Sequence, residues 1–585
     1  MKRVISLILQ KAIQKSFNFK LTIQEIENLI EIPPESLMGD FAFPCFFLSS
    51  KLKKSPQEIT LKIKKEIKKL PKEISEIKVL GPYLNFFVNK KILAVNLIKE
   101  ILQNKKYGSN NYEKMKKTSV EFPSPNTNKP LHLGHLRNMA IGESISRILE
   151  FSGGKVFRNS LNNDRGVHIC KSMIAYEKYG ENKTPESVKK KSDHFVGDYY
   201  VLFSEKKISD EEIQEMLRGW ERATSQEKLK KSITERGREQ GDKKILALWK
   251  KMNKWALDGF KETYKKYEIR LDKEYFESKI YLQGKEIIEQ GLKKGIFKRK
   301  NDGSIFIDLN NEKLGEKIVL RADGTSIYIT QDLYLAKLKF DELKIDRSIY
   351  VVGNEQDYHF NVLVAILKKL KFNFADKIKH LSYGMVVLPE GRMKSREGKV
   401  VDADDLIEEV QNLAKKELIS RSALSQKELN SRSLKIALAS IKYFLLKTDI
   451  KKDMLFNPEE SIRFDGDTGP YIQYSYARAN SILKKSKIKN NLNKFEIETL
   501  HPAEIELIKK LSQFKEIVLK AYETLNPSLI AHYSYQLAQN FNEFYHSCPV
   551  VDSKEEEFRI KLVKSFMQIL KNSLNLLGIE TLDEM

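Results

Sequence analysis

The sequence predicts a multidomain α/β protein built around a doubly wound, Rossmann-like parallel sheet. The chain has 585 residues, too many for one hydrophobic core, so roughly three to four domains are expected. From Thr118 the pattern runs strand, loop, helix and strand again at Lys155–Leu161, which is the order of a βαβ unit. From about residue 405 nearly every stretch favours helix, which predicts an all-α C-terminal domain.

The chain is strongly basic, with 103 Lys and Arg residues against 79 Asp and Glu residues and a net charge of +24. This excess favours a polyanionic partner, most simply nucleic acid, although the heavy use of Lys, Asn and Ile also fits an AT-rich genome. The three cysteines lie far apart without a C-x-x-C pair, which argues against a structural zinc site and indicates a reducing compartment. Because no run approaches about 18 apolar residues, we expect no transmembrane helix and a cytoplasmic protein.

Residues 1–110 are expected to form a small α+β domain. The apolar run Val4–Leu9 is shorter than the core of a signal peptide and continues as an amphipathic helix. Ser55–Glu58 is a capping box with proline at the first helical position. Lys78–Val88 is typical of strand material, interrupted at Gly81-Pro82.

Residues 111–400 are expected to contain the parallel sheet. A charged, helix-favouring stretch at about 175–300 holds all three tryptophans and is interpreted as a helical insertion between the two halves of the sheet. The second half is expected to use strands at Ser304–Leu309, Ser326–Thr330 and Ser348–Gly353. A connecting helical segment should follow at 401–460, and the all-α domain at 461–585.

The stretch Glu121–Asn138, EFPSPNTNKPLHLGHLRN, is the centre of the candidate chemistry. It is predicted to be a strand end, a proline-containing loop and a helix start, which together suit phosphate binding. His132 and His135 are three residues apart, so both imidazoles can face one ligand. Gly134 lacks a Cβ and lets a flat ring such as adenine approach the backbone. Two histidines that only cap or pack the helix are the alternative.

This string resembles the HIGH signature of class I aminoacyl-tRNA synthetases, in the form found in arginyl-tRNA synthetases. The resemblance implies that His132 and His135 bind the phosphates of ATP and stabilise the charge that develops as the adenylate forms. It also implies a second loop, KMSKS in the class, at Gly391–Lys399 (GRMKSREGK). Its ATP-binding positions would be Arg392, Met393, Lys394, Ser395 and Arg396. Since Ser395 replaces a class lysine, Lys129 is expected to supply the missing cation.

The amino-acid site should offer a guanidinium group a carboxylate and neutral acceptors. Tyr328–Asp332 and Gly353–Gln356 resemble segments that line the arginine pocket in this family. The resemblance assigns Tyr328 and Asp332 to the guanidinium group, and Asn126 and Gln356 to the other end of arginine or to the rest of the pocket. As an alternative, Asp332 could cap a helix that begins at Leu333.

The resemblance covers nearly the whole chain. Its N-terminal part is similar to the additional tRNA-binding domain of arginyl enzymes, and Phe276–Ser278 is similar to a segment of the insertion. Thr468–Tyr474 resembles the start of the anticodon-binding bundle. The candidate tRNA contacts there are Tyr471, Gln473, Tyr474, Tyr476 and Arg478, with the tyrosines as base-stacking platforms.

These features predict an arginine–tRNA ligase. Arginine and ATP, with Mg²⁺, would give arginyl-adenylate and pyrophosphate, and the arginyl group would pass to the 3′ terminal adenosine of tRNA(Arg). The resemblance implies a monomer that activates arginine only with tRNA bound. No structural zinc and no metal-ligating residues are expected.

Three alternatives are weighed against this function. Another class I synthetase is the nearest, but the interval from His135 to Met393 leaves little room for a large editing domain, and three scattered cysteines cannot build the metal site of the cysteinyl enzyme. A small-molecule nucleotidyltransferase would not need a large basic helical domain. A non-catalytic tRNA-binding paralogue would not need both histidines, Lys129 and Asp332.

Overall fold

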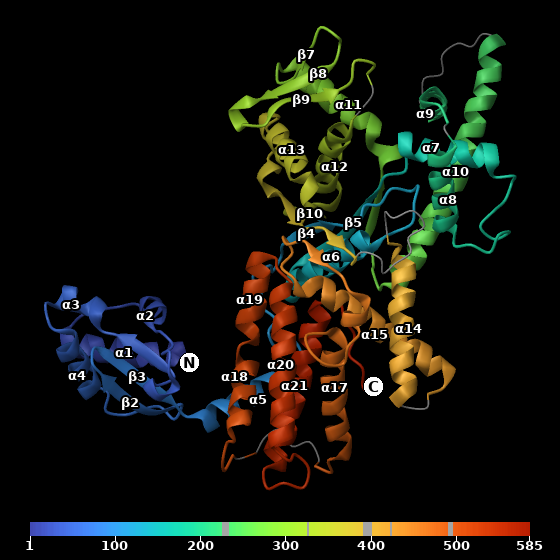
Figure 1. The fold of residues 1–585 in the computed structure, drawn as a ribbon. Coiled ribbons are helices and arrows are strands. Elements are labelled where there is room, and N and C mark those ends of the chain that lie inside the picture. The colour runs from blue at the N-terminus through green and yellow to red at the C-terminus, as the bar shows by residue number, and fades with distance from the viewer. Residues whose placement is uncertain are drawn as a thin grey trace. The chain divides into compact units, whose positions relative to one another are not determined.

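The computed structural model describes residues 1–206, 208–224, 233–324, 327–389, 401–421, 424–488, 495 and 497–585 (Figure 1). The chain divides into two compact units. The first comprises 1–105, 482–512 and 540–568, and the second comprises 106–481, 513–539 and 569–585. None of the helices in the described ranges has the length and apolar character needed to cross a membrane. The four-domain division expected from the sequence stays a prediction.

The N-terminal part of the first unit is an α+β fold around a three-stranded antiparallel sheet of order β1-β3-β2. Its elements are α1 (Lys2–Phe17), α2 (Ile23–Leu29), β1 (Phe41–Pro44), α3 (Phe46–Leu52), α4 (Pro56–Glu66), β2 (Ile74–Leu80), β3 (Tyr83–Val88) and α5 (Lys90–Gln103). Ser55 caps α4 by accepting the Glu58 N–H at 3.2 Å, as the sequence indicated. The predicted interruption at Gly81-Pro82 is the turn between β2 and β3.

The second unit contains a five-stranded parallel sheet of order β11-β10-β4-β5-β6. The strands are β4 (Lys117–Glu121), β5 (Lys155–Asn162), β6 (Lys273–Phe276), β10 (Arg347–Gly353) and β11 (Ile378–Tyr383). The predicted doubly wound sheet is therefore confirmed. The strand order reverses between β4 and β10, and ligands of such sheets bind beyond the carboxyl ends of the strands at that point.

Helix α6 (Leu133–Phe151) follows β4 and is buried along most of its length. Gly142 explains how closely the helix approaches the strand end, because a Cβ there would lie 2.4 Å from the Phe122 ring. The absence of a side chain at Gly142 therefore allows the histidine-bearing helix to pack closely against the end of the central strand β4.

Between β5 and β6 the chain forms α7 (Val167–Tyr179), α8 (Ser192–Glu205), α9 (Asp210–Thr224) and α10 (Ile233–Lys266), so this stretch is helical as predicted. Strand β6 falls inside the interval expected to be the insertion, yet it belongs to the parallel sheet. Four residues after a long charged helix are too short a run for periodicity to identify as a strand.

Two of the three later strand predictions need correction. Ser348–Gly353 corresponds to β10, but the stretch at Ser304–Leu309 forms β8 (Ile305–Leu309) in a separate antiparallel sheet with β7 (Lys298–Arg299) and β9 (Gly315–Leu320). The strand prediction at Ser326–Thr330 is wrong: Ser326 lies outside the described residues, and Tyr328 begins helix α12 (Tyr328–Leu343).

Tertiary packing explains why α12 begins in a β-favouring stretch. Helix α11 (Glu277–Lys293) lies so close that a Cβ on Gly284 would be 2.3 Å from the Thr330 carbonyl oxygen. Thr330 also accepts the Ile327 N–H at 3.3 Å, which satisfies a backbone donor at the helix start. Packing and capping here override intrinsic preference.

The remainder of the chain is mainly helical, which confirms the predicted all-α character beyond residue 405. It comprises α13 (Asp357–Lys369), β12 (Val386–Val387), α14 (Ala403–Arg421), α15 (Gln426–Lys447), β13 (Met454–Leu455), α16 (Pro458–Ser461), α17 (Gly469–Lys485), α18 (Pro502–Ser512), α19 (Phe514–Thr524), α20 (Ser528–Ser547) and α21 (Glu556–Leu576).

Arg137 of α6 is fully buried and joins this helix to two distant segments. Its Nη1 donates to the carbonyl oxygens of Gly384 at 2.6 Å and Met385 at 2.8 Å, just before β12. Its Nη2 donates to Lys452 at 2.8 Å and Ile450 at 3.3 Å, just before β13. A single guanidinium group thus satisfies the carbonyl groups of Gly384 and Lys452 and adds a second donor to those of Met385 and Ile450, which also accept backbone N–H groups.

We predict that Arg137→Met lowers the midpoint of thermal unfolding by several degrees. Hydrogen bonds from a charged donor contribute about 1.5–3 kcal/mol each, and the variant removes the donor of the Gly384 and Lys452 carbonyl groups. Differential scanning calorimetry measures the midpoint. Arg463→Met is the control, since Arg463 is exposed and, in the part of the chain that the structure describes, pairs with the exposed Asp465 at 2.9 Å, a contact that water screens. Equal midpoints in the two variants would refute the role of Arg137.

Candidate active site

The two histidines of the motif cap α6 together. His132 is the N-cap residue, and its Nδ1 accepts the Gly134 N–H at 3.1 Å. The His132 N–H donates to Nδ1 of His135 at 3.1 Å, and the two ring centroids are 3.9 Å apart. Because each Nδ1 is an acceptor, each neutral ring carries its proton on Nε2. Capping is therefore compatible with ligand binding, since it leaves both Nε2–H groups to donate.

Both histidines are held in the neutral form. Burial, helped by the positive charge of Lys129, lowers the pKa of His132 to about 4. Burial and the charges of His132 and Lys129 lower the pKa of His135 well below its ordinary value. Lys129 is half-buried and forms no ion pair within the described residues. Together with the N-terminus of α6, its ammonium group makes this a site for an anion.

Gly134 has a role that the sequence did not reveal. A Cβ at this position would lie 2.9 Å from Cε1 and 3.0 Å from Nδ1 of His132. A side chain at residue 134 would therefore push the capping ring aside. The glycine is required by the His132 cap itself, in addition to any close approach of a ligand.

The predicted second loop lies outside the described residues, and Arg392, Met393, Lys394, Ser395 and Arg396 are not placed. The chain that follows it is placed, and it pairs with the histidine motif. Leu133 donates its N–H to the Val401 carbonyl oxygen at 2.9 Å, and Ala403 donates to the Leu131 carbonyl oxygen at 3.0 Å. His132 faces Asp402 in this antiparallel pairing.

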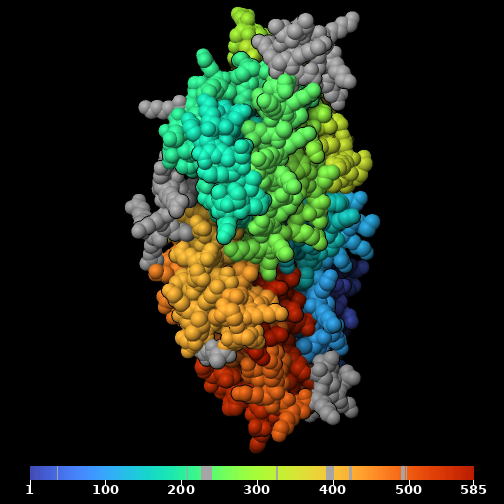
Figure 2. Space-filling view, turned by 90° about the vertical axis from the view of Figure 1, so that its right-hand side faces the viewer, coloured from blue at the N-terminus to red at the C-terminus, as the bar shows by residue number. Residues whose placement is uncertain are grey.

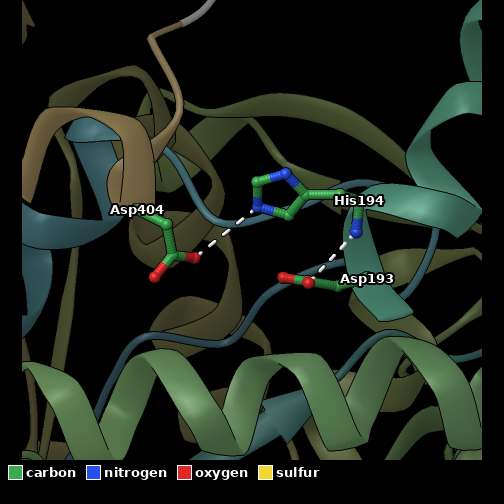
Figure 3. A group of neighbouring side chains, drawn as sticks. All are labelled: Asp193, His194 and Asp404. Carbon is green, nitrogen blue, oxygen red and sulfur yellow. Dashed lines mark hydrogen bonds and ion pairs between the residues drawn. The ribbon is translucent and has the colours of Figure 1, made fainter. Parts of the chain in front are cut away.

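Asp193, His194 and Asp404 gather near this pairing in an arrangement that could ligate a metal ion (Figure 3). However, Nζ of Lys191 lies 2.7 Å from Asp404 Oδ2 and 3.1 Å from Asp193 Oδ2. This ammonium group already pairs with both carboxylates. The cluster is therefore better described as an internal ion-pair network than as a metal centre.

Tyr328 and Asp332 lie one helical turn apart on α12, on the same side of the helix. Because the helix begins at Tyr328, Asp332 is not an N-cap residue, and the capping alternative is wrong. Asp332 Oδ2 instead lies 2.6 Å from Nε2 of His359. Tyr328 is 64% exposed and the Asp332 side chain is 24% exposed, so a small molecule can reach part of each.

Glu277 is a residue that the sequence analysis placed only in an insertion segment. It follows β6 directly and is buried. One oxygen, Oε1, accepts from Gln331 at 2.8 Å and lies 3.6 Å from Arg165 Nη1, whereas Oε2 has no hydrogen-bond partner within the described residues. Burial, reinforced by the charges of Asp164 and Asp332, raises the pKa of Glu277 to about 7. Its position after a parallel strand is the signal that could have identified it.

Asn126 and Gln356 lie on the two sides of the point where the strand order reverses. Asn126 follows β4 and is exposed, and its backbone pairs with Asn163 beyond β5. Gln356 is exposed in the short turn after β10. Within the described residues, neither side chain is hydrogen-bonded to Tyr328 or Asp332.

Two of the candidate tRNA contacts are not accessible. Gln473 is fully buried and donates to the Glu580 carbonyl oxygen at 2.7 Å. Tyr476 is 6% exposed and hydrogen-bonds to Thr581. The C-terminal segment therefore covers both, and neither can stack on a base in this structure. The remaining candidates, Tyr471, Tyr474 and Arg478, are half-buried.

Comparison with known families covers most of the chain. Residues 97–458 match the family described as tRNA synthetases class I (R), catalytic domain. Residues 3–88 match the arginyl tRNA synthetase N terminal domain, and residues 472–585 match the DALR anticodon binding domain.

Curated relatives and solved structures show the same similarity. The chain is 45% identical to an arginine–tRNA ligase of Treponema denticola, over 95% of this chain and 94% of that one. It is 44% identical to one of Borrelia duttonii, over 99% and 98%. The arginyl-tRNA synthetase of Thermus thermophilus superposes with a TM-score of 0.75 at 25% identity, over 100% of both chains.

We predict that His132 stays neutral from pH 8 down to about pH 5, because burial and Lys129 hold its pKa at about 4. NMR titration of protein labelled with ¹³C at histidine Cε1 measures this, and loss of the signal in His132→Asn assigns it. A midpoint between pH 6 and 7 for that signal would contradict the geometry described for the site.

Proposed function

The chain belongs to the arginyl-tRNA synthetases and is an ATP-dependent arginine–tRNA ligase, and from this premise we propose how its own residues divide the reaction. ATP and arginine are substrates of the first step, in which an oxygen of the arginine carboxylate attacks the α-phosphorus of ATP and pyrophosphate leaves. The arginyl group then passes from the adenylate to the tRNA.

The start of α6 is proposed to bind the phosphates of ATP, which enters as its Mg²⁺ complex. The single observation that supports this most is the pair of neutral rings whose Nδ1 atoms are occupied by backbone N–H groups, so that both Nε2–H groups can donate. Such fixed donors stabilise charge that develops on phosphoryl oxygens. Lys129 supplies a full positive charge beside them. It takes the place of the class lysine, because Ser395 at that position carries no charge. Arg392–Arg396 would close the nucleotide site from the loop that precedes Val401.

The guanidinium group of arginine is proposed to bind Asp332, with Tyr328 as a further partner and Glu277 as a second carboxylate. Partial burial raises the pKa of Tyr328, and the charges of Glu277 and Asp332 raise it further. The three groups therefore share one electrostatic environment. Arg165 Nη1 lies 3.6 Å from Glu277 Oε1, and a bound guanidinium group would add a second cation and give Oε2 of Glu277 a partner. Asn126 and Gln356 would bind the polar end of arginine near the strand-order reversal.

The tRNA is proposed to be tRNA(Arg), bound through the DALR-matching region with Tyr471, Tyr474 and Arg478 as candidate contacts. Arg478 lies 4.8 Å from the Tyr474 ring centroid, so a cationic and an aromatic group are presented together, as in many RNA sites. The net charge of +24 would attract the tRNA over a distance. We further propose that the enzyme acts as a cytoplasmic monomer.

ATP–pyrophosphate exchange with each amino acid in turn, with and without tRNA(Arg), tests the proposed substrate and the order of the reaction. We expect exchange with arginine and only in the presence of tRNA. Exchange driven by a different amino acid, or no exchange with arginine and tRNA together, would contradict the proposal.

The arginine pocket is tested by Asp332→Asn, which keeps the shape of the side chain and removes its charge. We expect the KM for arginine in pyrophosphate exchange to rise about 10- to 100-fold, since a charged hydrogen bond contributes about 1.5–3 kcal/mol. Asp341→Asn is the matched control, because Asp341 lies on the same helix, is exposed and, among the described residues, pairs with Lys337. An unchanged KM in Asp332→Asn would show that this carboxylate does not bind the guanidinium group.

A further inference from the structure

Asp402 lies where the starts of three helices meet. Its backbone faces His132, the cap of α6. Its Oδ1 accepts the N–H groups of Asp404 at 2.8 Å and Asp405 at 3.2 Å, and so caps α14. Its Oδ2 lies 3.3 Å from Nε2 of His194, near the start of α8. The Asp402 side chain thus links the insertion to the segment Val401–Ala403, which pairs with the histidine motif.

The His194 side of this link is firmly fixed. Lys191 donates to Asp404 Oδ2 at 2.7 Å and to Thr263 Oγ1 at 2.6 Å, and Thr263 donates in turn to the same carboxylate at 2.9 Å. A Cβ on Gly259 of α10 would lie 2.3 Å from Asp193 Oδ1, so α8 and α10 are in close contact. Figure 2 shows the insertion helices, in teal and green, meeting the light orange segment of α14.

Helix α8 also touches the histidine motif directly. A Cβ on Gly197 would lie 2.6 Å from Cδ of Pro130, in the loop between Lys129 and Leu131. The insertion therefore contacts the motif on both sides, at Pro130 before the histidine and through Asp402 opposite it.

His194 lies within a cluster of charged groups. Asp193, Asp402 and Asp404 bring three carboxyl groups together, against Lys191, with Lys266 at 3.8 Å from Asp404. Nε2 of His194 lies 3.3 Å from Asp402 Oδ2 and 3.6 Å from Asp404 Oδ2, so one ring nitrogen faces both side chains. Burial lowers the pKa of His194, but the nearby carboxyl groups outweigh it and raise the pKa above its ordinary value.

We propose that His194 and Asp402 are positioning residues for adenylate formation. His194 holds the side chain of Asp402, and Asp402 holds the segment Val401–Ala403 against Leu131–Leu133. This backbone pairing fixes the ring of His132. The inference rests on the proposed role of His132 in binding the phosphates of ATP. It assigns a task in the chemical step to the helical insertion.

Steady-state pyrophosphate exchange with the full-length enzyme, arginine and tRNA(Arg) tests the proposal. We expect His194→Ala to lower kcat about 10- to 100-fold, the range of losses that a small misplacement causes, with the KM for arginine changed less than about twofold. His194→Gln should recover most of the rate, because its amide nitrogen can reach the place of Nε2. Asp402→Asn, which keeps the helix cap, should lower kcat in the same way. Asp198→Asn on α8, an exposed partner of Lys190, is the control and should leave the rate unchanged.

A double-mutant cycle with His132→Ala separates positioning from a purely structural role. If His194 acts through His132, the double variant should be no slower than His132→Ala alone, within about twofold. A further loss equal to that of His194→Ala would overturn the inference, as would an unchanged kcat in His194→Ala or a failure of His194→Gln to recover activity. An unchanged rate in His132→Ala would overturn the proposed role of His132 and this inference with it, whereas a reduced rate there leaves the His194 result decisive.

Discussion

The site depends on the reciprocal capping of α6, in which the Nδ1 atoms of His132 and His135 accept backbone N–H groups. This interaction satisfies orphan donors at the helix start, sets the tautomer of each ring and leaves two Nε2–H donors at the same place. It also explains Gly134, since a Cβ there would collide with the His132 ring. Capping and the proposed ligand binding thus share one arrangement, and Arg137 fixes the same helix one turn later through four carbonyl groups.

The two halves of the proposed site have opposite charge. The half at the start of α6 suits the negative phosphates of ATP, and the half at α12 suits the positive guanidinium group of arginine. The start of α6 offers Lys129, neutral donors and the positive end of a helix, which suit the phosphates of ATP. The start of α12 and the end of β6 offer Asp332 and a buried Glu277, which suit a guanidinium group. The start of α6 and Glu277 follow β4 and β6, two strands of one parallel sheet, where ligands of doubly wound folds bind, and the start of α12 follows β9 of the antiparallel sheet.

Much of this could be predicted from the sequence because the signals are local. The order of strands and helices and the histidine motif follow from periodicity, turn residues and spacing. The errors occur where distant contacts decide the outcome. Packing against α11 turned the β-favouring residues after Ile327 into a helix. Strand β6 was too short to recognise from the sequence. The position of Glu277 at the end of a parallel strand could therefore not be predicted. Gln473 and Tyr476 looked accessible because the segment that buries them lies about a hundred residues later.

A crystal structure with arginine, tRNA(Arg) and a non-hydrolysable ATP analogue tests the central claim most directly. The account predicts phosphate oxygens within about 2.7–3.2 Å of Nε2 of both His132 and His135, with each Nδ1 still bonded to its backbone N–H. It also predicts the guanidinium group of arginine at Asp332. Phosphates bound away from the start of α6, or histidine rings turned so that Nδ1 meets the ligand, would contradict it.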